Sequence, residues 1–184
     1  MSAHFKKVSE NEKGYNPADV DAWVERAREQ FANPASHVLD ARSLRGAEFS
    51  LVKGGYEIAA VDTALDRLDD AFAAQEANRM LVRGGHQGAA EHLAGIRQVL
   101  EQRLQRGKRK VFDRTGLVRK GYSVRQVDAL LAVIEAELSG SQLPSVATLR
   151  AAAFSLRWSG YNEAQVDAFI DRVIQYSQLS RTLG

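Results

Sequence analysis

The sequence predicts an all-α fold of four short turn-plus-helix repeats, with a connecting helix between the second and third and little or no strand. A Gly-Tyr pair occurs four times, and Val-Asp follows it each time at the fifth and sixth positions after the tyrosine. Helical apolar spacing follows each pair, whereas strand-type alternation is nearly absent. The motif residues are Gly14, Tyr15, Val20, Asp21, Gly55, Tyr56, Val61, Asp62, Gly121, Tyr122, Val127, Asp128, Gly160, Tyr161, Val166 and Asp167.

Each repeat is expected to be a turn that leads into an amphipathic helix beginning at the tyrosine. The fifth, eighth, ninth and twelfth positions after the tyrosine are apolar in all four segments, which is one stripe of an α-helix. Asn16-Pro17 predicts an N-cap side chain followed by proline at the first helical position. Ser123…Gln126 and Asn162…Gln165 have the spacing of a capping box, and the second segment has the weakest start.

The recurring glycine, tyrosine and aspartate have structural interpretations. Glycine predicts either a backbone angle closed to other residues or the close approach of another segment. The tyrosine is expected to be half-buried with its hydroxyl at the surface. The aspartate lies beyond the first helical turn, so we expect it to accept hydrogen bonds from a neighbouring turn, such as a Gly-Tyr backbone.

A second layer of similarity predicts a duplicated pair, A-B-A-B. The second and fourth segments share a lead-in, residues 43–51 and 148–156, whereas the first and third have Phe5 and Phe112 ten residues before the tyrosine. The predicted organisation is therefore a first repeat pair at 1–83, a connecting helix at 84–107 and a second repeat pair at 108–184.

The connecting helix begins after Gly84-Gly85, which is expected to end the preceding helix, and Gly107 closes it. Pro34 and Pro144 mark turns that lead into short helices or turns at 36–42 and 145–153. Only 110–112 and 49–52 have a composition that would allow brief strand pairing.

Composition and charge exclude several classes of protein. The chain has 184 residues, no cysteine and a formal net charge of +2, which is too small to indicate nucleic-acid binding. No apolar run is long enough to span a membrane, and the absence of cysteine fits a reducing, cytoplasmic compartment. The basic run from Arg103 to Lys120 indicates either a solvated face, a partner for the acidic helix that starts near Asp62, or contact with anionic lipid.

No catalytic or ligand-binding motif is present, so we expect a protein that is not an enzyme. The four histidines, His4, His37, His86 and His92, lack metal-ligand spacing, and no phosphate-binding loop or dinucleotide fingerprint occurs. We therefore expect no catalytic site, metal, cofactor or small-molecule substrate.

Two segments resemble the N-terminal domain of the DivIVA family. Residues 16–26 read NPADVDAWVER and residues 162–172 read NEAQVDAFIDR, each directly after Gly-Tyr. The chain is most similar to repeat proteins of Gram-positive bacteria that carry tandem copies of this domain. The resemblance implies a non-enzymatic division or pole-associated scaffold that forms coiled-coil dimers, assembles further and touches membrane through an apolar residue with a basic neighbour before Gly-Tyr.

The sequence departs from the family pattern in two respects. The apolar membrane position, three residues before the tyrosine, is apolar only in the fourth segment, where Trp158 lies beside Arg157; Arg119 and Lys120 precede the third Gly-Tyr. No heptad run of three or four repeats follows any segment, so the long family coiled coil is missing. Arg157, Trp158, Arg119 and Lys120 are the candidate membrane or partner contacts, with Trp158 either buried or exposed.

The resulting expectation is a scaffold or interaction module that contacts protein partners, including itself, and weakly an anionic membrane at the inner face of the cell membrane. The alternative is a soluble regulatory or adaptor protein that has lost membrane binding. Adjacent repeats are expected to pair within one chain and to bury their stripes against each other.

Overall fold

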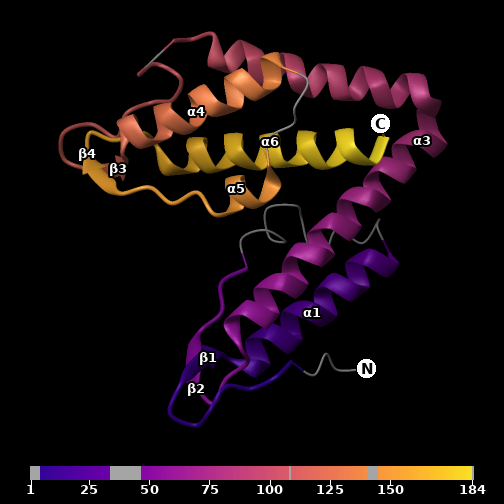
Figure 1. Ribbon diagram of the computed structural model, residues 1–184, viewed down its shortest axis with the longest axis vertical. Helices are drawn as coiled ribbons and strands as arrows, with labels where there is room; N and C mark the ends of the chain where they lie inside the picture. The colour runs from indigo at the N-terminus through magenta and orange to yellow at the C-terminus, as the bar shows by residue number, and fades with distance from the viewer. Residues whose placement is uncertain (1–4, 34–46, 108, 141–144, 184) are drawn as a thin grey trace. The chain divides into compact units, whose positions relative to one another are not determined.

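Helices form most of the described chain, as predicted, but two small antiparallel sheets accompany them. The computed structural model describes residues 5–33, 47–107, 109–140 and 145–183 (Figure 1). The helices are α1 (Pro17–Ala32), α3 (Ile58–Leu104), α4 (Val124–Ser139), α5 (Val146–Arg150) and α6 (Glu163–Leu183). The strands are β1 (Lys13–Tyr15), β2 (Leu51–Lys53), β3 (Lys120–Tyr122) and β4 (Leu156–Trp158).

The expectation of little or no strand is wrong at the Gly-Tyr pairs themselves. β1 pairs with β2, and β3 pairs with β4, both antiparallel. The residues Gly14-Tyr15 and Gly121-Tyr122 are extended because their backbones pair with a segment distant in sequence, which helical periodicity does not report. Of the two segments with strand-compatible composition, 49–52 overlaps β2, whereas 110–112 forms no strand.

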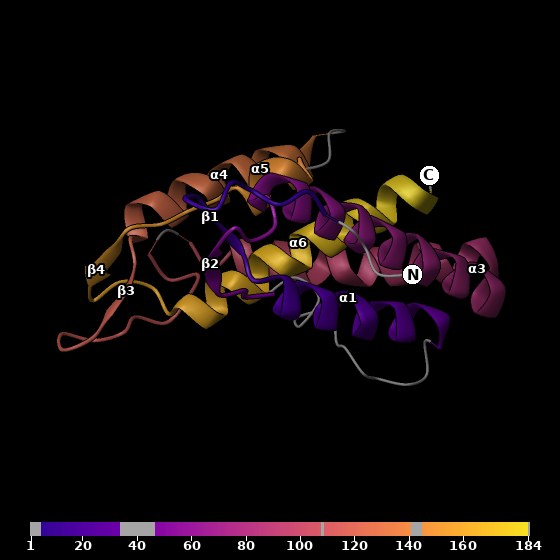
Figure 2. The same ribbon diagram turned by 90° about the horizontal axis from the view of Figure 1, so that it is seen from below.

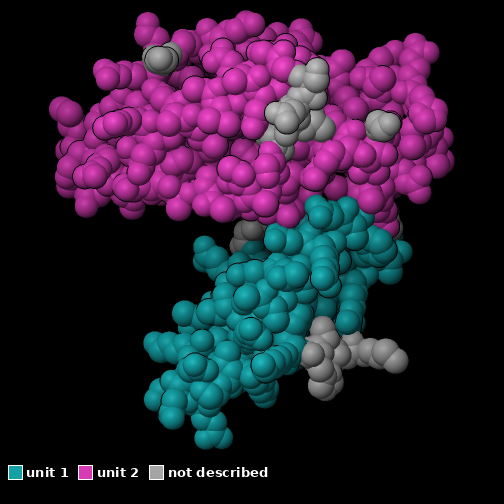
Figure 3. All heavy atoms as spheres, viewed as in Figure 1, with its two compact units in different colours: residues 1–72 teal, residues 73–184 magenta. Residues whose placement is uncertain are grey.

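The chain divides into two compact units, residues 1–72 and 73–184 (Figure 3). We call them unit 1 and unit 2 and describe each by itself. Unit 1 holds the first two Gly-Tyr segments, and unit 2 holds the third and fourth. The boundary lies inside α3, and the predicted connecting segment 84–107 belongs to unit 2.

The predicted apolar stripes are the inner faces of the helices. In unit 1, Val20, Trp23 and Ala27 of α1 are buried, as is Val61 of α3. In unit 2, the fourth segment buries its whole stripe. The core of unit 2 also contains Ile96, Leu100 and Leu104 from the second part of α3. The other buried apolar side chains of this core include Val111, Phe112, Val127, Leu131, Ile134, Leu138, Val166, Phe169, Ile170 and Val173.

The helices begin two residues after the tyrosines rather than at them. The Asn16 side chain accepts a hydrogen bond from the Ala18 amide at 3.1 Å, and Pro17 occupies the first turn, as predicted. Asn162 also caps its helix, since its Oδ1 accepts from the Gln165 amide at 3.2 Å. Ser123 makes no such bond, so the capping box predicted there is wrong.

The predicted short helix at 145–153 is α5, which Ser145 caps by accepting from the Thr148 amide. Pro34, Pro144 and the segment predicted at 36–42 lie outside the described residues. In unit 2, β3 and β4 lie side by side near the first turns of α4 and α6 (Figures 1 and 2).

Helix α3 is interrupted at Gly85, where the sequence predicts an end. Gly85 has φ 63° and ψ −170°, a conformation that is essentially restricted to glycine. Gly84 has no positive φ, and a Cβ added to either glycine would meet no atom within 4 Å. Backbone conformation alone, rather than crowding, therefore requires glycine at 85.

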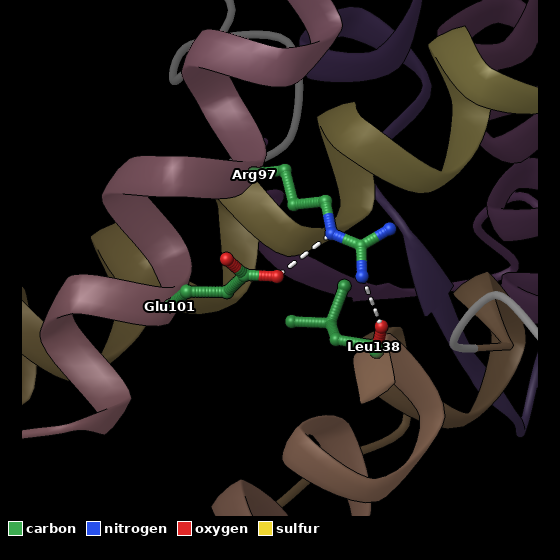
Figure 4. A network of polar contacts seen from close by, with 3 residues as sticks. All are labelled: Arg97, Glu101 and Leu138. Atoms are coloured by element: carbon green, nitrogen blue, oxygen red, sulfur yellow. Dashed lines mark hydrogen bonds and ion pairs between the residues drawn. The ribbon is translucent and has the colours of Figure 1, made fainter. Parts of the chain in front are cut away.

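One polar network joins the second part of α3 to the end of α4. The Arg97 guanidinium donates to the Leu138 carbonyl at 2.7 Å and pairs with Glu101 at 2.7 Å (Figure 4). The Leu138 carbonyl is among the last of α4 and has no partner within its own helix. Arg97 therefore caps α4 with a charged side chain from a different helix.

The break in α3 yields a first prediction. Gly85→Ala should lower the free energy of unfolding by about 1–3 kcal/mol, because alanine must adopt the strained conformation or move the helix. Gly84→Ala is the matched control and should be neutral or stabilising by up to about 1 kcal/mol. Urea denaturation followed by circular dichroism measures both. Equal effects of the two substitutions would contradict a conformational requirement at Gly85.

Candidate functional site

The two Gly-Tyr segments of each unit cross at backbone contact. In unit 1, the Tyr15 amide donates to the Tyr56 carbonyl at 2.9 Å, and the Tyr56 amide donates to the Tyr15 carbonyl at 2.8 Å. In unit 2, Tyr122 and Tyr161 exchange the same two bonds at 3.0 and 2.8 Å. The segments of a pair therefore recognise each other reciprocally and within one chain.

Glycine is required before each tyrosine because the crossing leaves no room for a side chain. A Cβ at Gly14 would lie 2.2 Å from the Tyr56 carbonyl oxygen, and one at Gly121 would lie 2.2 Å from that of Tyr161. Gly55 and Gly160 would meet the opposite backbone at 2.6 and 2.3 Å. None of these four glycines has a positive φ. Of the two predicted roles, close approach of another segment is therefore correct.

The recurring aspartates accept hydrogen bonds from tyrosine hydroxyls of the opposite segment. The Tyr161 hydroxyl donates to Asp128 at 2.9 Å, and the Tyr56 hydroxyl lies 3.3 Å from both oxygens of Asp21. Tyr122 makes a longer contact of 3.5 Å with Asp167, and burial, together with the carboxylate of Asp62, raises the pKa of Tyr15. The neighbouring segment is the donor, as predicted, but through a side chain rather than through the Gly-Tyr backbone.

The tyrosine rings differ in depth within each pair. Tyr56 and Tyr161 are buried, whereas Tyr15 and Tyr122 are half-buried, so the predicted half-burial holds for two of the four. Burial raises the pKa of all four hydroxyls, and the facing aspartate raises each pKa further. The effect is largest at Tyr161, where the hydrogen bond to Asp128 adds to burial.

Each lead-in phenylalanine packs against the tyrosine of the opposite Gly-Tyr segment. Phe5 meets Tyr56 with ring centroids 5.4 Å apart, and Phe112 meets Tyr161 at the same distance. In the other member of each pair, Phe49 lies 5.2 Å from Tyr15, and Phe154 lies 5.1 Å from Tyr122. These separations are those of favourable aromatic pairs.

The residue four positions after each of three tyrosines ties its helix to a distant segment. Asp19 accepts from the Ser50 amide at 3.1 Å and also from the Ser50 hydroxyl, which lowers the pKa of Asp19. Gln126 accepts from the Ser155 amide at 2.8 Å. Gln165 accepts from the Asp113 amide at 2.9 Å and donates to its carboxylate at 2.7 Å. The side chains of Gln126 and Gln165 therefore bond to the lead-in of the opposite segment and do not reach back to their own N-cap residues.

The four candidate contact residues come together on the sheet of unit 2. Lys120 lies opposite Trp158, and Gly121 lies opposite Arg157, with Arg119 directly before β3. Trp158 is 63 % exposed, which settles the choice between burial and exposure, and the Lys120 Nζ lies 5.3 Å from the centroid of its ring. Arg119, Lys120 and Arg157 are also exposed.

Two further residues of this surface, Leu117 and Val118, were not among the contact residues predicted from the sequence. They are 87 % and 91 % exposed in the turn before β3. The signal was present as two adjacent apolar residues after Gly116, which has φ 77°, inside a basic run. We call Leu117, Val118, Arg119, Lys120, Arg157 and Trp158 together the apolar-basic tip.

The corresponding turn of unit 1 has a different chemistry. Glu10, Asn11 and Glu12 precede Lys13 and Gly14, where Leu117, Val118 and Arg119 precede Lys120 and Gly121. The turn is closed by the Ser9 hydroxyl, which donates to Glu12 at 2.9 Å. Lys53 of β2 lies opposite Lys13, in the register of Trp158 opposite Lys120. The same scaffold thus carries a polar turn in unit 1 and an apolar-basic one in unit 2.

Among the described residues, no three His, Asp or Glu side chains are placed to hold a metal ion. A shallow recess in unit 1 is lined by Lys6, Lys13, Glu12, Glu57 and the start of α3. Within the described ranges, no helix is both long and apolar enough to cross a membrane.

Comparison of the chain with protein-family models, with curated proteins and with solved structures finds no match.

The exchanged tyrosine and aspartate side chains yield a second prediction. Asp128→Ala should destabilise the protein by about 1–3 kcal/mol, because the buried Tyr161 hydroxyl loses its acceptor. For Asp167→Ala, the part of the effect that depends on the Tyr122 hydroxyl should be smaller, about 0.5 kcal/mol, because that contact is long. Thermal and urea unfolding measure both variants. A double-mutant cycle with Tyr161→Phe should show that most of the Asp128 effect disappears once the hydroxyl is gone. An unchanged Asp128 effect in that cycle would contradict the assignment.

The raised tyrosine pKa values predict a loss of stability in alkali. A tyrosine whose pKa is higher in the folded state holds its proton more tightly there. The resulting stabilisation is present below the unfolded pKa of about 10 and is lost as pH rises through and above it. Unfolding free energy measured from about pH 8 to 11 should therefore fall more steeply in the wild type than in Tyr161→Phe. Parallel pH profiles for the two proteins would rule out a contribution from Tyr161.

Proposed function

We propose that this chain is a non-enzymatic scaffold or interaction module that resembles DivIVA-type division and polar-growth proteins. It acts through protein–protein contacts and makes a weak contact with an anionic membrane at the inner face of the cell membrane. The observation that carries the proposal is the same reciprocal crossing built twice in one chain, with a different tip on each unit. A scaffold that is constant while its exposed turns vary is suited to presenting surfaces to partners.

The shared geometry supports an A-B-A-B duplication. Four features correspond between the units. They are the strand register, the reciprocal tyrosine amide bonds, the phenylalanine–tyrosine contacts and the contacts from each tyrosine hydroxyl to an aspartate of the opposite segment. Independent origins would not be expected to reproduce all four features at equivalent positions. In this proposal each unit is one pair of DivIVA-like domains that associate within a chain.

The apolar-basic tip is the proposed membrane contact. Leu117 and Val118 form an almost fully exposed apolar pair at the end of a turn, and Trp158 has the amphipathic ring typical of membrane interfaces. Arg119 and Lys120 follow Leu117 and Val118 in the chain, and Arg157 precedes Trp158; each basic residue near an anionic surface contributes about 1 kcal/mol. A single tip of this size supports reversible binding rather than stable anchoring.

The polar turn of unit 1 favours a second candidate, a regulatory or adaptor protein that has lost membrane binding. Glu10 and Glu12 would be repelled by an anionic surface, so unit 1 is not expected to contribute to membrane binding. If unit 2 also fails to bind vesicles, this alternative becomes the better description.

Vesicle binding tests the proposal. The full chain should co-sediment with vesicles containing anionic lipid and not with neutral ones. The double variant Leu117→Glu/Val118→Asn, which places the unit 1 residues on the unit 2 turn, should bind at least about tenfold more weakly, because apolar burial is lost and a charge is repelled. Trp158→Ser should also weaken binding and leave thermal stability nearly unchanged.

The matched control is the reverse exchange in unit 1. Glu10→Leu/Asn11→Val should retain or strengthen vesicle binding, because it adds a second apolar turn to the same scaffold. Circular dichroism verifies that both double variants remain folded. Absence of wild-type binding to anionic vesicles at low salt would refute the membrane contact and favour the adaptor.

A further inference from the structure

We propose that β4 is a docking edge for an extended segment of a partner protein, which adds to the β3–β4 sheet as a further strand. The segment alternates apolar and acidic residues. This inference rests on the proposed function as an interaction module and names the kind of partner that unit 2 fits.

The hydrogen-bond register leaves the outer edge of β4 open. The Ser123 amide donates to the Ser155 carbonyl at 2.9 Å, and the Ser159 amide donates to the Arg119 carbonyl at 3.3 Å. In an antiparallel ladder, every second pair of facing residues is hydrogen-bonded. Ser123–Ser155 and Arg119–Ser159 are two such pairs, so Gly121–Arg157, which lies between these two pairs, is the third. Leu156 and Trp158 therefore direct their amide and carbonyl groups away from β3, and no described residue bonds to these groups.

The opposite edge of β3 is already occupied. Tyr122 directs its amide and carbonyl away from β4 and bonds both to Tyr161, which in turn bridges to Arg114. β4 is thus the open edge of this sheet, and an open edge is a template for strand addition.

The side chains of β4 select the partner's residue pattern. Leu156 and Trp158 share one face of the strand and are 50 % and 63 % exposed, so an added strand should place apolar residues beside them. Arg157 points to the other face and is exposed, which favours an acidic residue there. Arg119 and Lys120 add positive charge at the end of the sheet, and neither forms an ion pair within the described chain.

The charge pattern also argues against a second copy of this chain as the occupant. An antiparallel pair of two β4 strands centred on Arg157 would place the two guanidinium groups directly opposite each other. Like charges at such positions are destabilising, so a separate acidic partner is favoured over self-pairing.

Unit 1 provides a built-in comparison. β2 has the same register, but Lys53 occupies the place of Trp158 and half-buried Val52 that of Arg157. A lysine on an edge strand opposes strand addition because its charge must stay hydrated. The edge strand β2 of unit 1 therefore carries a lysine that opposes strand addition, whereas the edge strand β4 of unit 2 carries a tryptophan at the same place.

The test uses the full chain and a capped heptapeptide of alternating valine and glutamate, followed by NMR. The amide signals of Leu156 and Trp158 should shift on titration, and their hydrogen exchange should slow by about tenfold or more once they are bonded to the peptide. The β2 amides should not respond. A peptide N-methylated at the amides that face β4 should not bind, whereas methylation at the alternate amides should be tolerated.

Two variants separate this inference from the membrane contact. Trp158→Lys copies unit 1, where Lys53 lies opposite Lys13, and should abolish peptide binding with only a small loss of thermal stability from the facing charge of Lys120. Leu117→Glu/Val118→Asn should lose vesicle binding but retain peptide binding. Peptide binding that survives N-methylation of the β4-facing amides or survives Trp158→Lys would overturn the inference, as would no binding at all. Wild-type vesicle binding would then still support the proposed membrane contact.

Discussion

The rest of each unit depends on the crossing of two Gly-Tyr backbones. Four glycines approach the opposite main chain so closely that any side chain would overlap it, and the tyrosine amides and carbonyls bond each other across the contact. This crossing fixes where two helices begin, which faces they turn inward and which turns project outward. Because the contact is made by the backbone, the projecting turns can change in sequence without disturbing it.

Side chains around the crossing reinforce it from both directions. Phenylalanines from the lead-ins cover the tyrosine rings, the tyrosine hydroxyls reach aspartates on the opposite helices, and Asp19, Gln126 and Gln165 tie helix starts to distant lead-ins. Most of these contacts link one Gly-Tyr segment to the other rather than a segment to itself. A single segment would leave them unmade, which explains why the pair is the structural unit.

Three differences between the two units lie at the exposed turn and the edge strand of the sheet. Leu117 and Val118 stand where unit 1 has Glu10 and Asn11, and Trp158 stands where it has Lys53. Exposed apolar side chains that lie together and beside polar residues are typical of interaction surfaces, and unit 2 carries such a group where unit 1 does not. The same sheet offers a turn suited to a membrane surface, which carries Leu117 and Val118, and an open edge suited to a strand, which carries Leu156; Trp158 belongs to both.

The sequence by itself determined the helices and their inward faces, because helical periodicity is a local property. The contact role of Trp158 and its basic neighbours stays a prediction. The sequence also predicted that a helix ends at Gly84-Gly85, where Gly85 interrupts α3, and that the recurring glycines and aspartates have structural roles. Only the tertiary structure decided that Gly14-Tyr15 and Gly121-Tyr122 lie in strands, that tyrosine hydroxyls are the donors to the aspartates and that residues 84–107 complete the core of unit 2. These features depend on segments that lie far apart in the chain, and no local pattern records which backbone meets which.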